Sequence, residues 1–207
     1  PSSSNGTFGP GTTATAAGST TGGGLTTSNV GTDSALSQQC IGGCFDFRIT
    51  GLTAGSAVNV VLPLSADIPA GAVYRKLIGS TWQSFATTGG NANASAAVIS
   101  ASPLVCPAAG SSSYSSGLTA GNRCVQLTIV DGGANDSDGT ANGTVLDPGG
   151  IGVVTSAAPT VFSGSTGGCS LVSRPASFAE RGDWAMVTMF MAWLGSVVYR
   201  RRQRSAA

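Results

Sequence analysis

The 207-residue chain contains no histidine, and this absence removes several large classes of catalytic and metal site. Ser-His-Asp and Cys-His sites both need an imidazole, and so does a zinc site with histidine ligands. Charged residues make up only 9% of the chain and aromatic residues only 6%. Lys76 is the only lysine, so any lysine chemistry depends on that one side chain. Paired carboxylates could still act as acid and base, but the acidic stretch at residues 131–147 has no aromatic residue near it to wall a pocket, so we do not expect an enzyme.

Basic residues are scarce outside the C-terminal tail. Residues 1–173 carry four cations and seven anions, whereas residues 174–207 carry six cations and two anions. The acidic main part offers no basic surface for a nucleic acid, so we expect no nucleic-acid partner. The first residue is proline rather than methionine, which indicates a fragment or a processed chain.

Five cysteines are present, and four of them lie in a region rich in Gly, Ser and Thr. We predict two disulfides, Cys40–Cys44 and Cys106–Cys124, and a different fate for Cys169. A zinc site with four thiolates is the alternative, but the spacings do not supply two pairs of knuckle ligands. Disulfides would place the domain outside the cytoplasm.

Short stretches in which apolar and polar residues alternate begin after Cys44. Phe45, Phe47 and Ile49 alternate with polar residues, as in a half-buried strand. Trp82 is the large core candidate of a later stretch. Turns rich in Gly, Pro, Ser and Asn separate the expected strands, which lie at about 45–50, 58–62, 72–78, 81–86, 96–101, 123–130 and 151–155. The pattern predicts an all-β fold, an immunoglobulin-like β-sandwich of about seven short strands.

Composition divides the chain into four segments. Residues 1–39 have few large apolar side chains to bury, so we expect a Gly/Ser/Thr-rich linker or the end of an upstream domain. Residues 40–155 contain the expected β-sandwich. Residues 156–183 form a second linker, and residues 184–207 a short transmembrane helix with a basic tail.

The sixteen residues from Trp184 to Tyr199 carry no charge, and four arginines follow closely: Arg200, Arg201, Arg202 and Arg204. A helix of this length spans about 24 Å, short of the roughly 30 Å of a bilayer core. Trp184 and Tyr199 can lie at the two interfaces, and arginines can extend to reach the headgroups. A buried core helix is the alternative. The arginines favour a membrane helix whose C-terminal end is cytoplasmic.

An acidic, glycine-rich loop follows the strand near residue 130. Its order of oxygen-bearing side chains is similar to that of D-x-D-G calcium loops, although the Glu and flanking helices of an EF-hand are missing. The candidate ligands are Asp131, Asn135, Asp136, Asp138, Asn142 and Asp147. The alternative is that Asp, Asn and Gly simply form tight turns. A calcium ion here would be structural, and we expect no other cofactor.

Two longer segments resemble a known bacterial family. The segments are VLPLSADIPAGAVYRK at residues 61–76 and DGGANDSDGTANGTVLDPGG at residues 131–150. In order and spacing they resemble the choice-of-anchor U domain, and the resemblance covers about residues 44–155. It implies a domain near the C-terminus of an exported protein, just before an anchoring signal. That family has no assigned catalytic residues, so none are implied here.

The tail resembles the tripartite C-terminal sorting signals, which consist of a short motif, an apolar helix and a basic end. Gly167, Gly168 and Cys169 are similar to the motif of the JDVT-CTERM, Myxo-CTERM and GlyGly-CTERM classes. The resemblance implies an intramembrane sorting protease as a partner, with Cys169 as the residue that accepts lipid. The alternative for Cys169 is a free thiol or an intermolecular disulfide.

Together these features predict a non-enzymatic C-terminal module of an exported bacterial protein. It would display and anchor an upstream passenger domain at the cell surface, and its basic C-terminus would be cytoplasmic before processing. An extracellular adhesion module is the alternative, binding protein or carbohydrate through a calcium-supported loop. A third hypothesis is a pore or signalling component that the helix holds permanently in the membrane.

Overall fold

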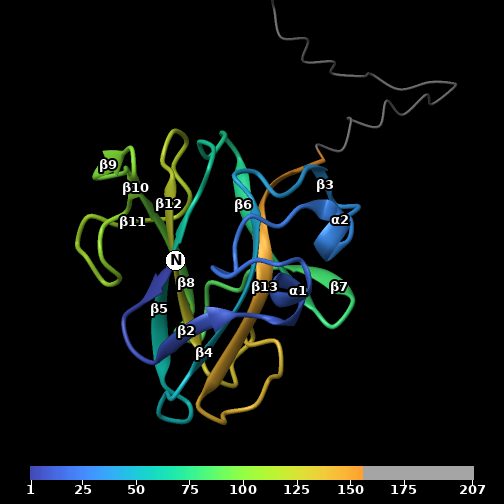
Figure 1. Cartoon of the computed structure of the whole chain (residues 1–207), viewed down its shortest axis with the longest axis vertical. Helices are drawn as coiled ribbons and strands as arrows, with labels where there is room; N and C mark the ends of the chain where they lie inside the picture. Colours follow the sequence, from blue (N-terminus) through green and yellow to red (C-terminus); the bar gives the residue numbers. More distant parts are fainter. Residues whose placement is uncertain (156–207) are drawn as a thin grey trace, which may run out of the picture. The chain divides into compact units, whose positions relative to one another are not determined.

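The alternating apolar residues of the sequence line the space between two antiparallel sheets. The computed structural model describes residues 1–155, which are mostly β with little helix (Figure 1). The five-stranded sheet has, in spatial order, β1 (Ser2–Ser3), β5 (Ala57–Pro63), β12 (Cys124–Val130), β8 (Ala92–Ala96) and β11 (Ser115–Ser116). The six-stranded sheet has β2 (Thr7–Pro10), β4 (Cys44–Thr50), β13 (Thr144–Val154), β6 (Ala72–Ile78) and β7 (Thr81–Ser84), and β3 (Leu36–Gln38) pairs with β13.

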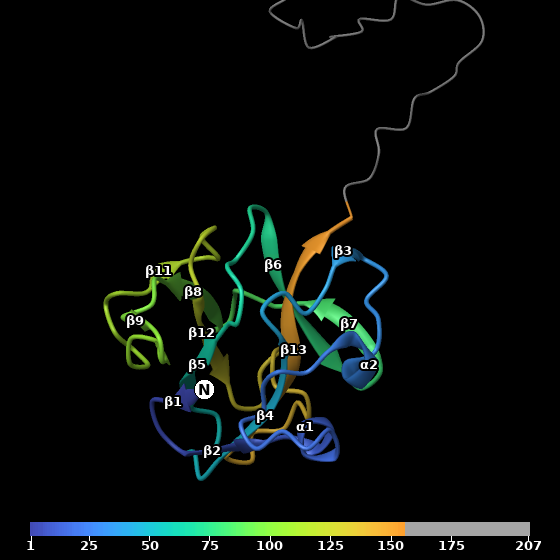
Figure 2. The ribbon, with the colours of Figure 1, turned by 45° about the horizontal axis from the view of Figure 1, so that its top comes forward.

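Four smaller elements complete the described part of the chain. A two-stranded hairpin is formed by β9 (Ser100–Ala101) and β10 (Leu104–Val105). Two short helices, α1 (Thr12–Ala16) and α2 (Thr27–Val30), lie on the side of the six-stranded sheet that faces away from the other sheet (Figures 1 and 2). The outer face of that sheet is therefore partly covered.

The main core lies between the two sheets. From the six-stranded sheet, Phe45, Phe47 and Ile49 of β4 are each at most 2% exposed. Alternate residues of β5 and β12 meet them from the other sheet: Val58, Val60, Leu62, Val125, Leu127 and Ile129. Truncation of a buried Phe to Ala costs about 3–5 kcal/mol, so Phe47 alone supplies a large share of the stability of a domain of this size.

Five of the seven predicted strands agree with the structure, but the strand expected at 96–101 is wrong, because β8 ends at Ala96 and the two-residue β9 begins at Ser100. Short strands that were not predicted, β1, β2, β3, β10 and β11, add to the sheets and hairpin, and the last strand is longer than expected. β13 begins at Thr144, although Pro148, Gly149 and Gly150 are residues typical of turns. Pro148 is tolerated because the pairing with β6 starts only at Gly149. Gly149 is required by a close approach, since a Cβ there would lie 2.7 Å from the carbonyl oxygen of Arg75.

Residues 1–39, which we expected to form a linker or the end of an upstream domain, contribute elements to both sheets. β1 pairs with β5, and β2 pairs with β4. The buried Asp46, on the outer face of β4, accepts hydrogen bonds from the backbone N–H groups of Thr13 (2.7 Å) and Ala14 (3.0 Å). The first turn of α1 has free N–H groups, and no N-cap side chain accepts a hydrogen bond from them. The Asp46 carboxylate takes this role. Backbone pairing and this cap order a segment whose composition offers little apolar surface.

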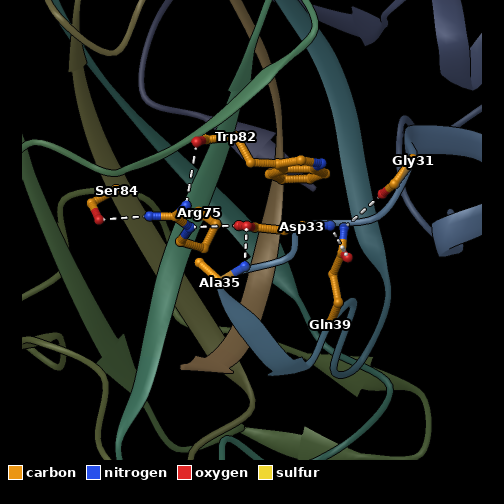
Figure 3. A network of polar contacts seen from close by, with 7 residues as sticks. All are labelled: Gly31, Asp33, Ala35, Gln39, Arg75, Trp82 and Ser84. Carbon is orange, nitrogen blue, oxygen red and sulfur yellow. Dashed lines mark hydrogen bonds and ion pairs between the residues drawn. The ribbon is translucent and has the colours of Figure 1, made fainter. Parts of the chain in front are cut away.

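A polar network attaches the loop between α2 and β3 to the hairpin of β6 and β7 (Figure 3). Arg75 Nε donates to Asp33 Oδ2 at 2.7 Å, and the same guanidinium donates to Ser84 Oγ and to the carbonyl oxygen of Trp82. The other carboxylate oxygen of Asp33 accepts from Ala35 N–H. Asp33 is only 4% exposed, so this ion pair is largely shielded from water.

Trp82 does not belong to the main core that we predicted for it. It packs instead against a second, smaller cluster formed by Ala14, Leu25, Val30 and Cys44. This cluster lies where residues 1–39 cover the six-stranded sheet. The prediction for Trp82 was wrong because those residues were not expected to form part of a core.

Candidate functional site

The most unusual chemical feature of the described residues is an ion pair inside the main core. Lys76 is 1% exposed and Asp147 is fully buried, and Lys76 Nζ lies 2.8 Å from Asp147 Oδ1. Lys76 Nζ also donates a hydrogen bond to the carbonyl oxygen of Leu146 at 3.1 Å. Charged side chains are rarely buried to this extent, because removing them from water is costly.

The register of the six-stranded sheet explains how the two side chains meet. Lys76 of β6 is paired with Gly149 of β13, and Asp147 precedes Gly149 by two residues on the same face. The two side chains are therefore diagonal neighbours, which is within reach of a long side chain such as lysine. Tyr74 and Ile151, on the same face of β6 and β13, belong to the main core, so the pair points toward the opposite sheet.

Glycine at position 149 leaves room beside this pair. A Cβ at that position would lie 2.8 Å from Cε1 and 2.9 Å from the hydroxyl oxygen of Tyr74. That hydroxyl is buried and has no hydrogen-bond partner among the described residues. Neither carboxylate oxygen of Asp147 makes a well-directed hydrogen bond within residues 1–155, although Oδ1 is close to Lys76 Nζ. Asp147 and Tyr74 thus keep unused bonding capacity in an apolar environment.

Burial controls how these groups ionise. Burial raises the pKa of Asp147, and the carboxylates of Asp46 and Asp136 act in the same direction, while Lys76 acts against them. Burial, together with the charge of Asp147, also raises the pKa of the Tyr74 hydroxyl well above its usual value. Tyr74 therefore stays protonated, and the neutral form of Asp147 is more accessible than that of an exposed aspartate.

The acidic loop uses its first carboxylate to hold backbone segments together. Asp131 is 2% exposed and accepts hydrogen bonds from the N–H groups of Gly55 (2.7 Å), Gly143 (2.9 Å) and Asn142 (3.4 Å). Burial alone would raise the pKa of Asp131, but these N–H groups outweigh burial and lower it. Asp131 therefore fixes the start of the loop to its end and to the turn that precedes β5.

The other predicted calcium ligands in the loop also have partners of their own. Asp136 accepts from the N–H groups of Gly132 and Leu146, and Asn135 makes two hydrogen bonds with the backbone of Ala86. Asp138 is exposed and accepts from Thr140 N–H and from the amide of Asn142. Asp147 points into the core toward Lys76.

These six residues do not fit a shared calcium ion in this arrangement. A calcium site needs six to eight oxygen atoms directed at one point. Within residues 1–155 no group of three Cys, Asp or Glu side chains is placed to hold a metal ion. The turn interpretation accounts for the loop better, because its carboxylates and amides bind backbone groups.

The two predicted disulfides are confirmed. Cys40 is bonded to Cys44, and Cys106 is bonded to Cys124. The first joins the loop before β4 to the start of that strand, and the second fixes the loop that follows β10 to the start of β12. Two disulfides in one domain indicate an extracytoplasmic environment.

The predicted processing and membrane residues lie outside the described part of the chain. They are Gly167, Gly168, Cys169, Trp184, Tyr199, Arg200, Arg201, Arg202 and Arg204. Among residues 1–155, none of the helices combines the length and apolar character needed to cross a membrane.

The pairing of Lys76 with Asp147 was not predicted from the sequence. The sequence did indicate that Lys76 is on the same face of its predicted strand as Tyr74, since the two residues are separated by one position. The partner was assigned to the acidic loop instead, since the residues after Asp147 resemble a turn. Comparisons with family models, with curated proteins and with solved structures find no match to this chain.

Proposed function

We propose that this chain is a non-enzymatic module of an exported bacterial protein, which displays an upstream passenger domain and anchors it at the cell surface. The observation that carries the proposal is the pair of disulfides in a two-sheet unit, because such bonds persist outside the cytoplasm. We also propose that the two packed sheets form an immunoglobulin-like β-sandwich.

The order of segments supports an anchoring role. β13 lies at the centre of the six-stranded sheet and ends at Val154, and the Gly-Gly-Cys motif, the apolar run and the arginines follow it in the sequence. A force on the tail would therefore act on a strand that is hydrogen-bonded on both sides. At the other end, β1 is an edge strand of the five-stranded sheet, where a passenger can join without disturbing the core.

The adhesion alternative has less support. It depended on a loop whose carboxylates bind a ligand or an ion, but Asp131 and Asp136 are both 2% exposed and bind backbone N–H groups. We therefore do not propose this loop as a binding surface.

A reporter fusion tests the proposed function. A fluorescent protein with an export signal is fused in front of residues 1–207 and produced in the organism that encodes the chain. The expected result is reporter that is accessible to external protease, remains with the cells and has lost the residues beyond about Cys169. Two matched chains carry Cys169→Ala or lack residues 184–207.

The two variants separate the steps of the proposal. The Cys169→Ala chain should accumulate in the membrane with Arg200–Arg204 still attached, and the chain without residues 184–207 should be released into the medium. Surface retention of the chain without residues 184–207 would refute anchoring through the tail. A wild-type chain that keeps its arginines at steady state would refute processing.

A further inference from the structure

The buried pair of Lys76 and Asp147 combines three properties that an ordinary structural ion pair does not need. The amine and the carboxyl group are in contact at 2.8 Å, both are shielded from water, and the carboxylate has no other partner of good geometry within residues 1–155. Structural buried charges are normally surrounded by further hydrogen bonds, because these compensate for lost hydration. Here the carboxyl group is held against a single group, a primary amine.

We propose that Lys76 and Asp147 condense into an intramolecular amide bond that covalently joins β6 to β13. Lys76 Nζ bonds to the side-chain carbonyl carbon of Asp147, the bond from that carbon to one carboxyl oxygen breaks, and one water molecule leaves. Nothing is oxidised or reduced, and no cofactor or second substrate takes part. The modification therefore needs only the folded chain.

The protons balance within the pair. One proton moves from the Lys76 ammonium to the Asp147 carboxylate, which converts the ion pair into a neutral amine and a neutral carboxylic acid. Burial favours this transfer at the carboxyl group, because it raises the pKa of Asp147. The amine then attacks the carboxyl carbon, and one of its remaining protons leaves with the departing oxygen as water. A desolvated lysine amine is an effective nucleophile.

The core supplies the positioning that such a reaction requires. The reacting groups are already in contact in a fixed orientation. The entropy cost of bringing two separate molecules together, which is a large part of the barrier in solution, is therefore absent. The sheet register fixes both backbones, and the carbonyl oxygen of Leu146 holds Lys76 Nζ at 3.1 Å. Exclusion of water also protects the product, since hydrolysis would need water to enter between the sheets.

Tryptic peptide mapping of the full chain tests the proposal. The protein is exported to an oxidising compartment, purified, incubated to constant mass, and then reduced and alkylated so that the disulfides are lost. Without the amide bond, trypsin cleaves after Arg75, Lys76 and Arg123 and releases separate peptides. With it, Lys76 is no longer a cleavage site, and residues 76–123 remain joined to the peptide that begins at Cys124.

The expected mass of the joined peptides is their sum less one water molecule, and fragmentation should locate the link at Lys76 and Asp147. Separate peptides of full mass from the wild-type chain would overturn the proposal, whatever the variants do. Water can also be lost by ring closure at Asp131–Gly132 or Asp138–Gly139. A loss that fragmentation places there, or that persists in Lys76→Met, would equally overturn it.

Two further variants test which carboxyl group forms the link. Asp147→Asn should give the same amide and the same joined peptides as the wild type, with ammonia leaving in place of water. Asp33→Asn is the matched control, because it changes the carboxylate of the other buried ion pair and should leave the link intact. Loss of the link in Asp33→Asn with the fold preserved would refute the assignment.

Discussion

Asp131 offers the most direct test of how the acidic loop is held. Asp131→Ala removes a buried carboxylate that accepts two short hydrogen bonds, from Gly55 and Gly143, and a longer one from Asn142. A hydrogen bond to a charged group contributes about 1.5–3 kcal/mol. Loss of the two short bonds should therefore lower the free energy of unfolding by about 3–6 kcal/mol, a large part of the stability of a typical domain.

The effect of Asp131 should depend on pH with a defined sign. Because its pKa is lowered in the folded protein, Asp131 stabilises the fold above its unfolded-state pKa of about 4. This contribution disappears as the pH falls through the lower folded-state pKa. The difference in stability between the wild type and Asp131→Ala should therefore be largest near neutral pH and should shrink in acid.

Urea denaturation followed by far-ultraviolet circular dichroism measures both effects, and Asp138→Ala is the matched control. Asp138 lies in the same loop, but its side chain is exposed and bonds only within the loop. We expect its removal to change the free energy of unfolding by less than about 1 kcal/mol. Equal urea midpoints for the two variants, or a difference for Asp131→Ala that does not vary with pH, would refute this account of the loop.

Three other predictions concern the tyrosine hydroxyl groups, the first turn of α1 and calcium binding by the acidic loop. Tyr74→Phe removes a buried hydroxyl without a partner among the described residues and should leave the thermal unfolding midpoint unchanged or higher, whereas Tyr114→Phe should lower it by removing a bond to Pro107 that is worth about 1 kcal/mol. A midpoint that falls in both would contradict this. Gly11→Ala places a Cβ against the Asp46 carboxylate that caps α1, and hydrogen exchange should show faster exchange in that helix only. Calorimetry with calcium and with a chelator should give the same transition, and a higher midpoint with calcium would show that the loop rearranges to bind the ion.

The sequence by itself determined the local features of this domain. Period-two alternation located the strands around Phe47 and Leu127, because one face of each strand is buried and the other is not. Sequence spacing also identified both disulfides, since the two cysteines of each pair are close to one another in the chain. The excess of small polar residues correctly indicated many turns, but it could not show which of them lie inside a strand.

Only the tertiary structure decided which polar residues are buried and against what. Asp131 and Asp138 belong to the same motif, yet Asp131 is buried and binds backbone N–H groups of two other segments, whereas Asp138 faces solvent. Likewise, Lys76 and Asp147 lie far apart in the chain and meet because β6 and β13 are neighbours in the sheet. Strand order and register are set by the packing of the whole core, so no local pattern around Lys76 could name its partner.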